Sequence, residues 1–239
     1  MPRIHDEGIP PELFYSNYFM TYVERDVHQL INVANKNAFE IFIKLLAGRV
    51  GQIVNLQRMS GEVGVSAPTL ASWLSVLEAS YIVFRLPCFF KNFGKRLTKS
   101  PKVYFTDVGL AAYLLGIKNS DQAARDPVLG GLFENLVVVE AMKSRYNLGQ
   151  ESGLYHFRDA RGLEVDLLLN LGQKLYPFEI KSARTFDSSF ASGLEKFMTF
   201  AEGATAPTVI YAGDMNPVIH NVTYANFKEI GRIIKKASA

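Results

Sequence analysis

The segment LYHFRDARGLEVDLLLNLGQKLYPFEIKSA, residues 154–183, decides the fold because it predicts three consecutive β-strands. The expected strands cover residues 154–158, 163–169 and 174–182. Asp159 and Gly162 suit the first and fourth positions of the turn between the first two strands. Gly172 suits the first central position of a type II′ hairpin between the last two. The segment therefore predicts a compact sheet with tight connections.

The hairpin at Gly172 also predicts a register. With residues 172 and 173 at its centre, Asp166 should face Glu179, and Glu164 should face Lys181. Facing Cβ atoms lie about 4.5–5.5 Å apart, and like charges at that distance are destabilising. Two facing carboxylates therefore need a counter-charge. Mg²⁺ or Mn²⁺ could supply it, because hard cations prefer oxygen ligands and Mg²⁺ often uses only one or two carboxylates.

A second interpretation of the same residues needs no metal, because an exposed sheet face often carries Asp, Glu and Lys without any chemistry. Pro177 inside the third strand could also force a bulge and change the register. Alternation along the strands sends a set of apolar side chains to the opposite face. These residues are Val165, Leu167, Phe178 and Ile180.

Composition limits the classes of protein that fit. The chain has 239 residues, of which 48% are hydrophobic, enough for one large domain or two smaller ones. Its net charge of +3 gives no global signal for binding a polyanion, so nucleic-acid contacts would need a local basic stretch. Cys88 is the only cysteine, which excludes an internal disulfide. With no apolar run long enough for a bilayer and no signal peptide, we expect a cytoplasmic location without membrane contact.

Periodicity predicts further elements on both sides of the central segment. Expected helices cover residues 10–33, 37–50, 110–115, 131–146, 186–201 and 225–236. Expected strands cover residues 81–90, 102–105, 208–211 and 218–223, and residues 117–130 are expected to form a loop. The order of helix, three strands, helix and strand from residue 131 onward predicts an α/β unit, or α+β, of the form α-β-β-β-α-β.

Residues 55–80 have the pattern of a helix-turn-helix, and the basic hairpin that follows suggests a winged helix. Ser66 can cap the second helix. That helix contains no Arg or Lys, the commonest residues for reading guanine. Basic residues of the hairpin could instead hold phosphates without sequence preference. The candidates for nucleic-acid binding are Arg85, Lys91, Lys95, Arg96 and Lys99. A docking module for a protein partner fits the same pattern.

Glu134 lies near the start of the helix expected over residues 131–146 and shares a face with Val137, Val138 and Ala141. A buried carboxylate needs a partner, so Glu134 is expected to face the sheet, where Lys181 or a metal could satisfy it. The alternative is an acidic residue favoured by the helix macrodipole at the N-terminus.

The arrangement of Glu134, Asp166 and Glu179-Ile180-Lys181 resembles the PD-(D/E)xK nuclease superfamily. The resemblance implies a restriction-endonuclease-like domain with Asp166 and Glu179 as ligands of Mg²⁺ or Mn²⁺. It also implies catalytic roles for Lys181, which would position or activate the attacking water, and for Glu134, which would assist. Val165 stands where the superfamily's name has a proline.

A longer resemblance covers residues 10 to 200. The segments that carry it are 22–26 (YVERD), 51–55 (GQIVN), 101–110 (PKVYFTDVGL), 131–135 (GLFEN) and 164–166 (EVD). They are similar to the C-terminal half, a domain of unknown function, of a prokaryotic family of AAA-type ATPases. That family places a P-loop ATPase domain before this half. The chain has no G-x-x-x-x-G-K-[ST] motif, so we expect no ATP site and no ATPase activity from these residues.

Together these observations predict two domains: a helical and winged-helix domain over residues 1–106 and a nuclease-like domain over residues 107–239. The leading hypothesis is metal-dependent cleavage of DNA. The rival is a non-catalytic module that binds DNA or a protein partner and regulates an ATPase.

Overall fold

The computed structural model describes residue 4 and residues 6–27, 35–89 and 100–238. The chain forms two compact units. The first consists of residues 1–85 and 103–132, and the second of residues 86–102 and 133–239. The chain therefore crosses between the units more than once. Among the described helices, none combines the length and apolar character that crossing a bilayer requires.

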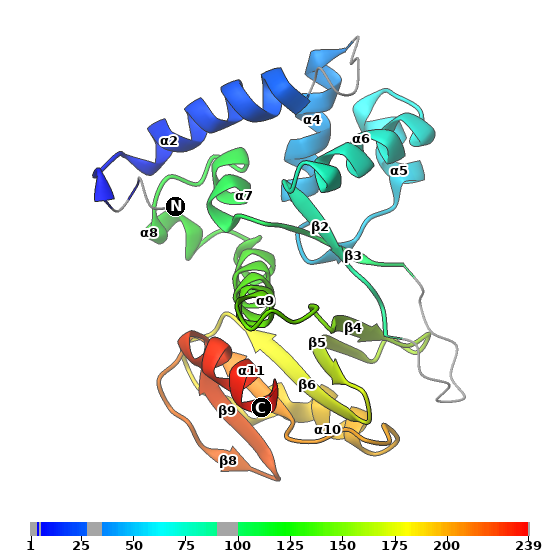
Figure 1. The fold of residues 1–239 in the computed structure, drawn as a ribbon, viewed down its shortest axis with the longest axis vertical. Coiled ribbons are helices and arrows are strands. Elements are labelled where there is room, and N and C mark those ends of the chain that lie inside the picture. The colour runs from blue at the N-terminus through cyan, green and yellow to red at the C-terminus, as the bar shows by residue number, and fades with distance from the viewer. Residues whose placement is uncertain (1–3, 5, 28–34, 90–99, 239) are drawn as a thin grey trace. The chain divides into compact units, whose positions relative to one another are not determined.

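The first unit is mostly helical (Figure 1). Its elements are α2 (Pro11–Tyr18), the π-helical segment η1 (Phe19–Val27), α4 (Lys36–Ala47), β1 (Gln52–Ile53), α5 (Leu56–Val63), α6 (Ala67–Ala79), β2 (Val83–Leu86), β3 (Lys102–Phe105), α7 (Val108–Leu114) and α8 (Ser120–Ala123). The strands form a small sheet in the order β1-β3-β2. The expected helix over residues 10–33 thus appears as α2 and η1 as far as Val27, and residues 28–34 lie outside the described part.

Local sequence signals explain the helix-turn-helix pair α5 and α6. Asn55 caps α5 by accepting a hydrogen bond from the amide of Arg58, and Ser66 caps α6 by accepting one from Thr69. Gly64 ends α5 with φ of 80°, a conformation that glycine adopts without strain. Trp73 of α6 packs in aromatic contacts with Phe39 and Phe42 of α4.

The second unit is an α/β arrangement. It contains most of α9 (Leu129–Asn147), followed by β4 (Leu154–Arg158), β5 (Glu164–Leu171), β6 (Lys174–Lys181), η2 (Ser188–Ala191), α10 (Ser192–Met198), β7 (Thr208–Tyr211), β8 (Val218–Ile219), β9 (Val222–Asn226), η3 (Phe227–Glu229) and α11 (Ile230–Ser238). The six strands form one sheet in the order β4-β5-β6-β7-β9-β8. Strands β4, β5 and β6 are antiparallel, whereas β6, β7 and β9 run parallel.

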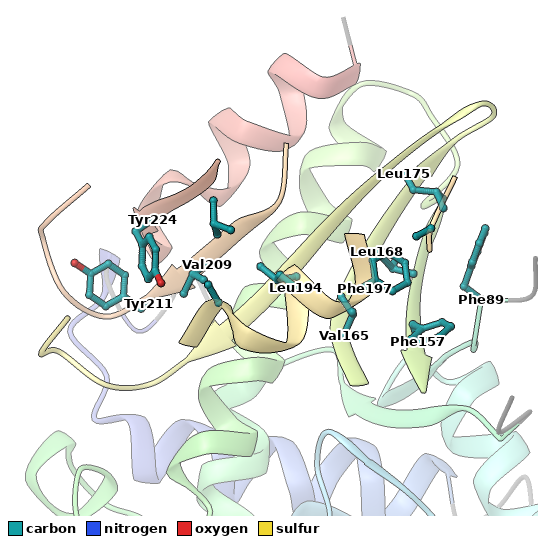
Figure 2. Close-up of a cluster of buried hydrophobic side chains, with 13 residues drawn as sticks. Phe89, Phe157, Val165, Leu168, Leu175, Leu194, Phe197, Val209, Tyr211 and Tyr224 are labelled. Atoms are coloured by element: carbon teal, nitrogen blue, oxygen red, sulfur yellow. The ribbon is translucent and has the colours of Figure 1, made fainter. Parts of the chain in front are cut away.

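Helices cover both faces of this sheet. Helix α10 lies on one face, and α9 and α11 lie on the other (Figures 1 and 2). Figure 2 shows the core beneath α10, where Leu194 and Phe197 pack among strand residues. The labelled strand residues of this cluster are Phe157, Val165, Leu168, Leu175, Val209, Tyr211 and Tyr224. These side chains are almost entirely buried, so burial of apolar area stabilises this face of the sheet.

The structure confirms the three predicted strands of residues 154–182 to within two residues at each end. It also confirms the register next to the turn, because Leu167 pairs with Phe178 and Leu171 with Lys174. Gly172 has φ of 70°, as the first central position of a type II′ turn requires. Pro177 pairs with Leu168 and produces no bulge between β5 and β6.

Several expectations need correction. The loop expected over residues 117–130 contains the short helix α8 and the first two residues of α9. The strand expected over 218–223 is two strands, β8 and β9, joined at His220 and Asn221, which both have positive φ. The strand expected over 81–90 is shorter in the described residues, where it forms β2.

The boundaries of the two units also differ from those of the predicted domains 1–106 and 107–239. Residues 107–132 pack within the first unit, where the hydroxyl of Tyr15 donates a hydrogen bond to Asp107 at 2.8 Å. Of residues 86–102, the described ones (86–89 and 100–102) belong to the second unit, where the amide of Phe89 donates a hydrogen bond to the carbonyl of His156. Each unit is built from two separate stretches of the chain, so one boundary position cannot divide them.

Candidate functional site

A cluster of six charged side chains lies within the second unit. Four of them are site residues predicted from the sequence, namely Glu134, Asp166, Glu179 and Lys181. The other two are Lys102 and Glu164. The cluster draws on α9, β5, β6 and the start of β3, so residues far apart in the sequence meet at one end of the sheet.

Lys102 lies at the centre of the acidic residues. Its side chain is only 4% exposed, and its Nζ is 2.8 Å from Glu134 Oε1 and 2.6 Å from Glu164 Oε1. Asp166 Oδ1 is 3.8 Å from the same nitrogen. Burial alone would lower the pKa of Lys102, but the three carboxylates outweigh it and raise that pKa. The same ammonium lowers the pKa of Glu164 against the effect of burial. Lys102 therefore stays charged and holds three carboxylates together.

A β-bulge places Asp166. On β4, Tyr155 pairs with Leu168 and Phe157 pairs with Val165. One residue of β4, His156, therefore lies opposite two residues of β5, Asp166 and Leu167. A bulge of this kind bends the strand and changes the direction of a side chain, and bulges are frequent beside functional sites. The carboxylate of Asp166 accepts a hydrogen bond from the amide of Ile180 at 2.8 Å, which anchors it to β6.

The bulge also corrects two expectations. Val165 does not point to the opposite face with Leu167, because it belongs to the cluster under α10. Glu164 does not meet Lys181. Instead, Glu164 is the strand-pairing partner of Arg158 on β4. Its carboxylate forms ion pairs with Lys102 and Arg158. Strict alternation from the hairpin could not foresee either change, since the extra residue on β5 shifts the pattern by one.

The negative charge of Asp166 acts on the carboxyl group of Glu179. Burial, and then the neighbouring carboxylate of Asp166, raise the pKa of Glu179 to about 7. Burial also raises the pKa of Asp166, while Lys102 and the amide of Ile180 oppose that change. A nearby like charge disfavours the charged form of Glu179, which explains the direction of the Asp166 contribution. The β5–β6 pairs run from Leu167 and Phe178 to Leu171 and Lys174, so the expected pairing of Asp166 with Glu179 is not among them, although Asp166 lies within electrostatic reach of Glu179.

Lys181 is the partner of Glu179. Its Nζ lies 2.5 Å from Glu179 Oε1, and its side chain is 37% exposed, so it is open to solvent on one side. The second oxygen of Glu179, Oε2, is buried and has no hydrogen-bond partner among the described residues. A buried acceptor without a donor is costly and is often explained by a bound ion or water.

A pocket of about 600 Å³ opens beside this oxygen. Glu164 and Glu179 lie in its wall together with two cations, Arg161 and Lys196. Gly193 of α10 lines it too, and a Cβ at this position would come within 3.7 Å of Glu179 Oε2. The absence of a side chain at Gly193 therefore keeps the space in front of Glu179 open.

These features fit a divalent cation bound by Asp166 and Glu179. Four carboxylates of the cluster face two ammonium groups, and one buried carboxylate oxygen is unpaired within the described part of the chain. No group of three or more His, Cys, Asp or Glu residues forms a ready metal-binding cluster in the residues that the structure describes. A site with two carboxylates is still adequate for Mg²⁺, which keeps waters and takes oxygens from a phosphate substrate.

Glu134 has a different partner from the one expected. Within the described residues, Glu134 forms an ion pair with Lys102, whereas Lys181 forms one with Glu179. In the sequence, Lys102 stands out only as part of a basic stretch, and it is absent from the predicted site residues. Its burial had no local signal, because a lysine at the start of a strand is ordinarily exposed, and only the structure places it among carboxylates.

The candidate nucleic-acid-binding residues form a separate group. Arg85 binds Glu78 of α6 through two hydrogen bonds, one of them 2.7 Å long, so a phosphate would compete with that carboxylate. The other candidates, Lys91, Lys95, Arg96 and Lys99, lie outside the described residues.

Comparison with known proteins places the chain among families of unknown function. A family model described as "Domain of unknown function (DUF8612)" matches residues 1–121, just over half of the chain. The chain belongs to this family. A second model, described as "Domain of unknown function (DUF4143)", matches residues 129–230 and so covers most of the second unit.

The curated relatives are uncharacterized proteins. One from Mycobacterium tuberculosis and one from Mycobacterium bovis are each 32% identical over 188 residues, which is 74% of this chain and 42% of the relative. One from Haemophilus influenzae is 25% identical over 142 residues, 57% of this chain and 34% of the relative. The chain therefore spans less than half the length of these relatives. No solved structure matches the chain significantly.

Proposed function

We propose that the second unit carries a site for metal-dependent cleavage of phosphodiester bonds in DNA. One observation carries this proposal. Glu179 is a buried carboxylate that contacts Lys181 and lies within electrostatic reach of Asp166, and its buried oxygen Oε2 has no partner among the described residues beside a pocket that Glu179 lines. Such an arrangement is stable only with a further positive charge or with protonation, and strongly perturbed carboxylates are common at functional sites.

In this proposal each residue has a defined task. Asp166 and Glu179 hold a Mg²⁺ or Mn²⁺ ion, which would lower the pKa of a bound water and stabilise charge on the phosphate. Lys181 contacts Glu179 and has one side open to solvent, so it can orient the attacking water. Glu134 does not reach the reaction directly, because Lys102 takes up its charge. Its role is to position Lys102 and, through it, Asp166.

The order of elements supports a restriction-endonuclease-like fold for this unit. The sequence α9-β4-β5-β6-α10-β7 matches the α-β-β-β-α-β order of the PD-(D/E)xK superfamily, and Asp166, Glu179 and Lys181 lie on its second and third strands. The order α4-β1-α5-α6-β2-β3 of the first unit supports a winged helix in the same way. Both assignments are part of the proposal.

The pocket suggests where DNA would lie. Arg161 and Lys196 line it, and neither forms an ion pair within the described part of the chain. Two unpaired cations beside a metal-binding carboxylate suit the phosphates that flank the bond to be cleaved. In the cell, this unit would work with an AAA-type ATPase domain that delivers or opens the DNA, as the resemblance to that ATPase family implies.

A non-catalytic module is the second candidate, and Lys102 favours it. This buried ammonium already neutralises part of the acidic cluster, so the cluster could serve only to stabilise the fold. The unit would then bind DNA or a protein partner and regulate an ATPase without cleaving anything.

The decisive experiment compares the parent protein with Lys181→Ala on supercoiled and single-stranded DNA. Each is assayed in Mg²⁺, in Mn²⁺ and in chelator. We expect the parent to cleave only with metal, and Lys181→Ala to lose cleavage while it still binds metal and DNA. Cleavage that persists in Lys181→Ala would point to a contaminating nuclease. Absence of cleavage by the parent, repeated in the presence of the ATPase domain of a longer relative, would favour the module.

A further inference from the structure

The position of Lys102 resembles that of a bound cation. Its ammonium is surrounded by carboxylate oxygens from two other elements, Glu134 on α9 and both Glu164 and Asp166 on β5, with Lys102 itself at the start of β3. The two closest oxygens are 2.8 and 2.6 Å away. Carboxylate oxygens converging on one point are also what a hard divalent cation requires.

We propose that Lys102 is a built-in cation that fills one of two cation positions in the acidic cluster, so that the protein binds a single divalent ion, on the Glu179 side. The identity of that single ion rests on the proposed function. The occupancy of the other cation position by Lys102 is independent of the proposed function. It predicts chemistry with one metal ion at this site, because the second position is permanently filled by the chain.

The surroundings of Lys102 hold it in place. All four residues of β3, from Lys102 to Phe105, are buried, so the backbone cannot move outward without exposing apolar side chains. An ammonium is a compact point charge with three donors, which suits three acceptors. Its withdrawal would leave three carboxylates close together, which is strongly unfavourable.

A divalent ion would fit on the Glu179 side of the cluster. Among the described residues, Lys102 and Lys181 contact the acids Glu134, Glu164, Asp166 and Glu179. The ion would place positive charge beside Glu179 Oε2, which is buried without a partner among the described residues. Arg158, 44% exposed, only touches the outer side of Glu164 at 3.5 Å.

The test is to count bound Mn²⁺ ions in the parent and in Lys102→Met. Methionine keeps an unbranched apolar stem of similar length but removes the ammonium. Binding is measured by isothermal titration and by electron paramagnetic resonance of free Mn²⁺. We expect one ion in the parent and two in Lys102→Met. Lys143→Met is the matched control, because it removes an ammonium next to Glu140 on the surface of α9, and it should bind as many ions as the parent.

The outcomes separate this inference from the proposed function. Equal numbers of ions in the parent and in Lys102→Met would overturn the inference. No ion in the parent would contradict both the single-ion inference and the metal of the proposed function, whereas one ion in each protein would contradict the inference alone. If Lys102→Met is unfolded in chelator, added Mn²⁺ must restore its folded circular dichroism, because the ion would replace the missing ammonium. Failure of Mn²⁺ to restore the fold would also overturn the inference.

Discussion

Nζ of Lys102 lies 2.8 Å from Oε1 of Glu134, although 32 positions separate the two residues in the sequence. This ion pair is almost completely buried and joins the start of β3 to α9. Its geometry explains how the acidic cluster can exist without a bound metal. It also makes Lys102 the residue on which the stability of the cluster depends most.

Replacing Lys102 should therefore be costly. Lys102→Ala leaves buried carboxylates without their cation, and we expect the free energy of unfolding to fall by about 3–5 kcal/mol in chelator. Urea unfolding followed by circular dichroism measures this change. Lys143→Ala removes an exposed partner of Glu140 and should change stability by less than about 1 kcal/mol. Similar losses in the two variants would contradict a special role for Lys102.

Metal should stabilise the folded protein. Because Asp166 and Glu179 are expected to hold the ion only in the folded state, Mn²⁺ at about 100 times its Kd should add about 2.7 kcal/mol by mass action. Thermal melts with Mn²⁺ and with chelator should differ for the parent and coincide for Asp166→Ala. Coincident melts for the parent would argue that no metal site is present.

The two cations that line the pocket should bind phosphates. If Arg161 and Lys196 each contact a phosphate of duplex DNA, replacing both by Ala should reduce the slope of log K against log salt by about 2. Fluorescence anisotropy with duplexes of different sequence measures this, and all sequences should weaken alike. Lys174→Ala, at the exposed hairpin of β6, is the control and should leave the slope unchanged. An unchanged slope in the double variant would remove the pocket from the DNA-binding surface.

Acid should destabilise the protein through His156. Burial, and then Lys102, lower the pKa of His156 to about 4, compared with 6.5 for an ordinary histidine. The unfolded chain therefore binds more protons between these values. The contribution of neutral His156 to the free energy of unfolding is complete above about pH 6.5. It is lost as the pH falls toward 4, and the total loss is about 3 kcal/mol.

Thermal melts of His156→Gln should depend less on pH over that range than melts of the parent. His220→Gln is the control, because His220 is 82% exposed and contacts Glu195 only at the surface. If His156→Gln and the parent lose stability in parallel from about pH 6.5 to 4, His156 does not carry the acid sensitivity.

Local patterns in the sequence determined much of the fold. Alternating apolar residues and turn residues such as Gly172 specify the strands of residues 154–182, because side-chain period and turn geometry act over a few residues. The same hairpin register is sufficient to predict that Asp166 lies near Glu179, since both residues belong to the two strands that the turn joins. Helix caps at Asn55 and Ser66 are equally local.

Only the tertiary structure decided the partners of the charged residues. The bulge at Asp166 depends on how β4 pairs with β5, and it redirected Val165 and Glu164. The burial of Lys102 depends on packing among β3, α9 and β5, which no sequence window contains. Ion pairs between distant segments depend on which side chains the packed molecule buries together, away from water. Strand period and turn chemistry depend only on neighbouring residues, so the sequence alone reveals them.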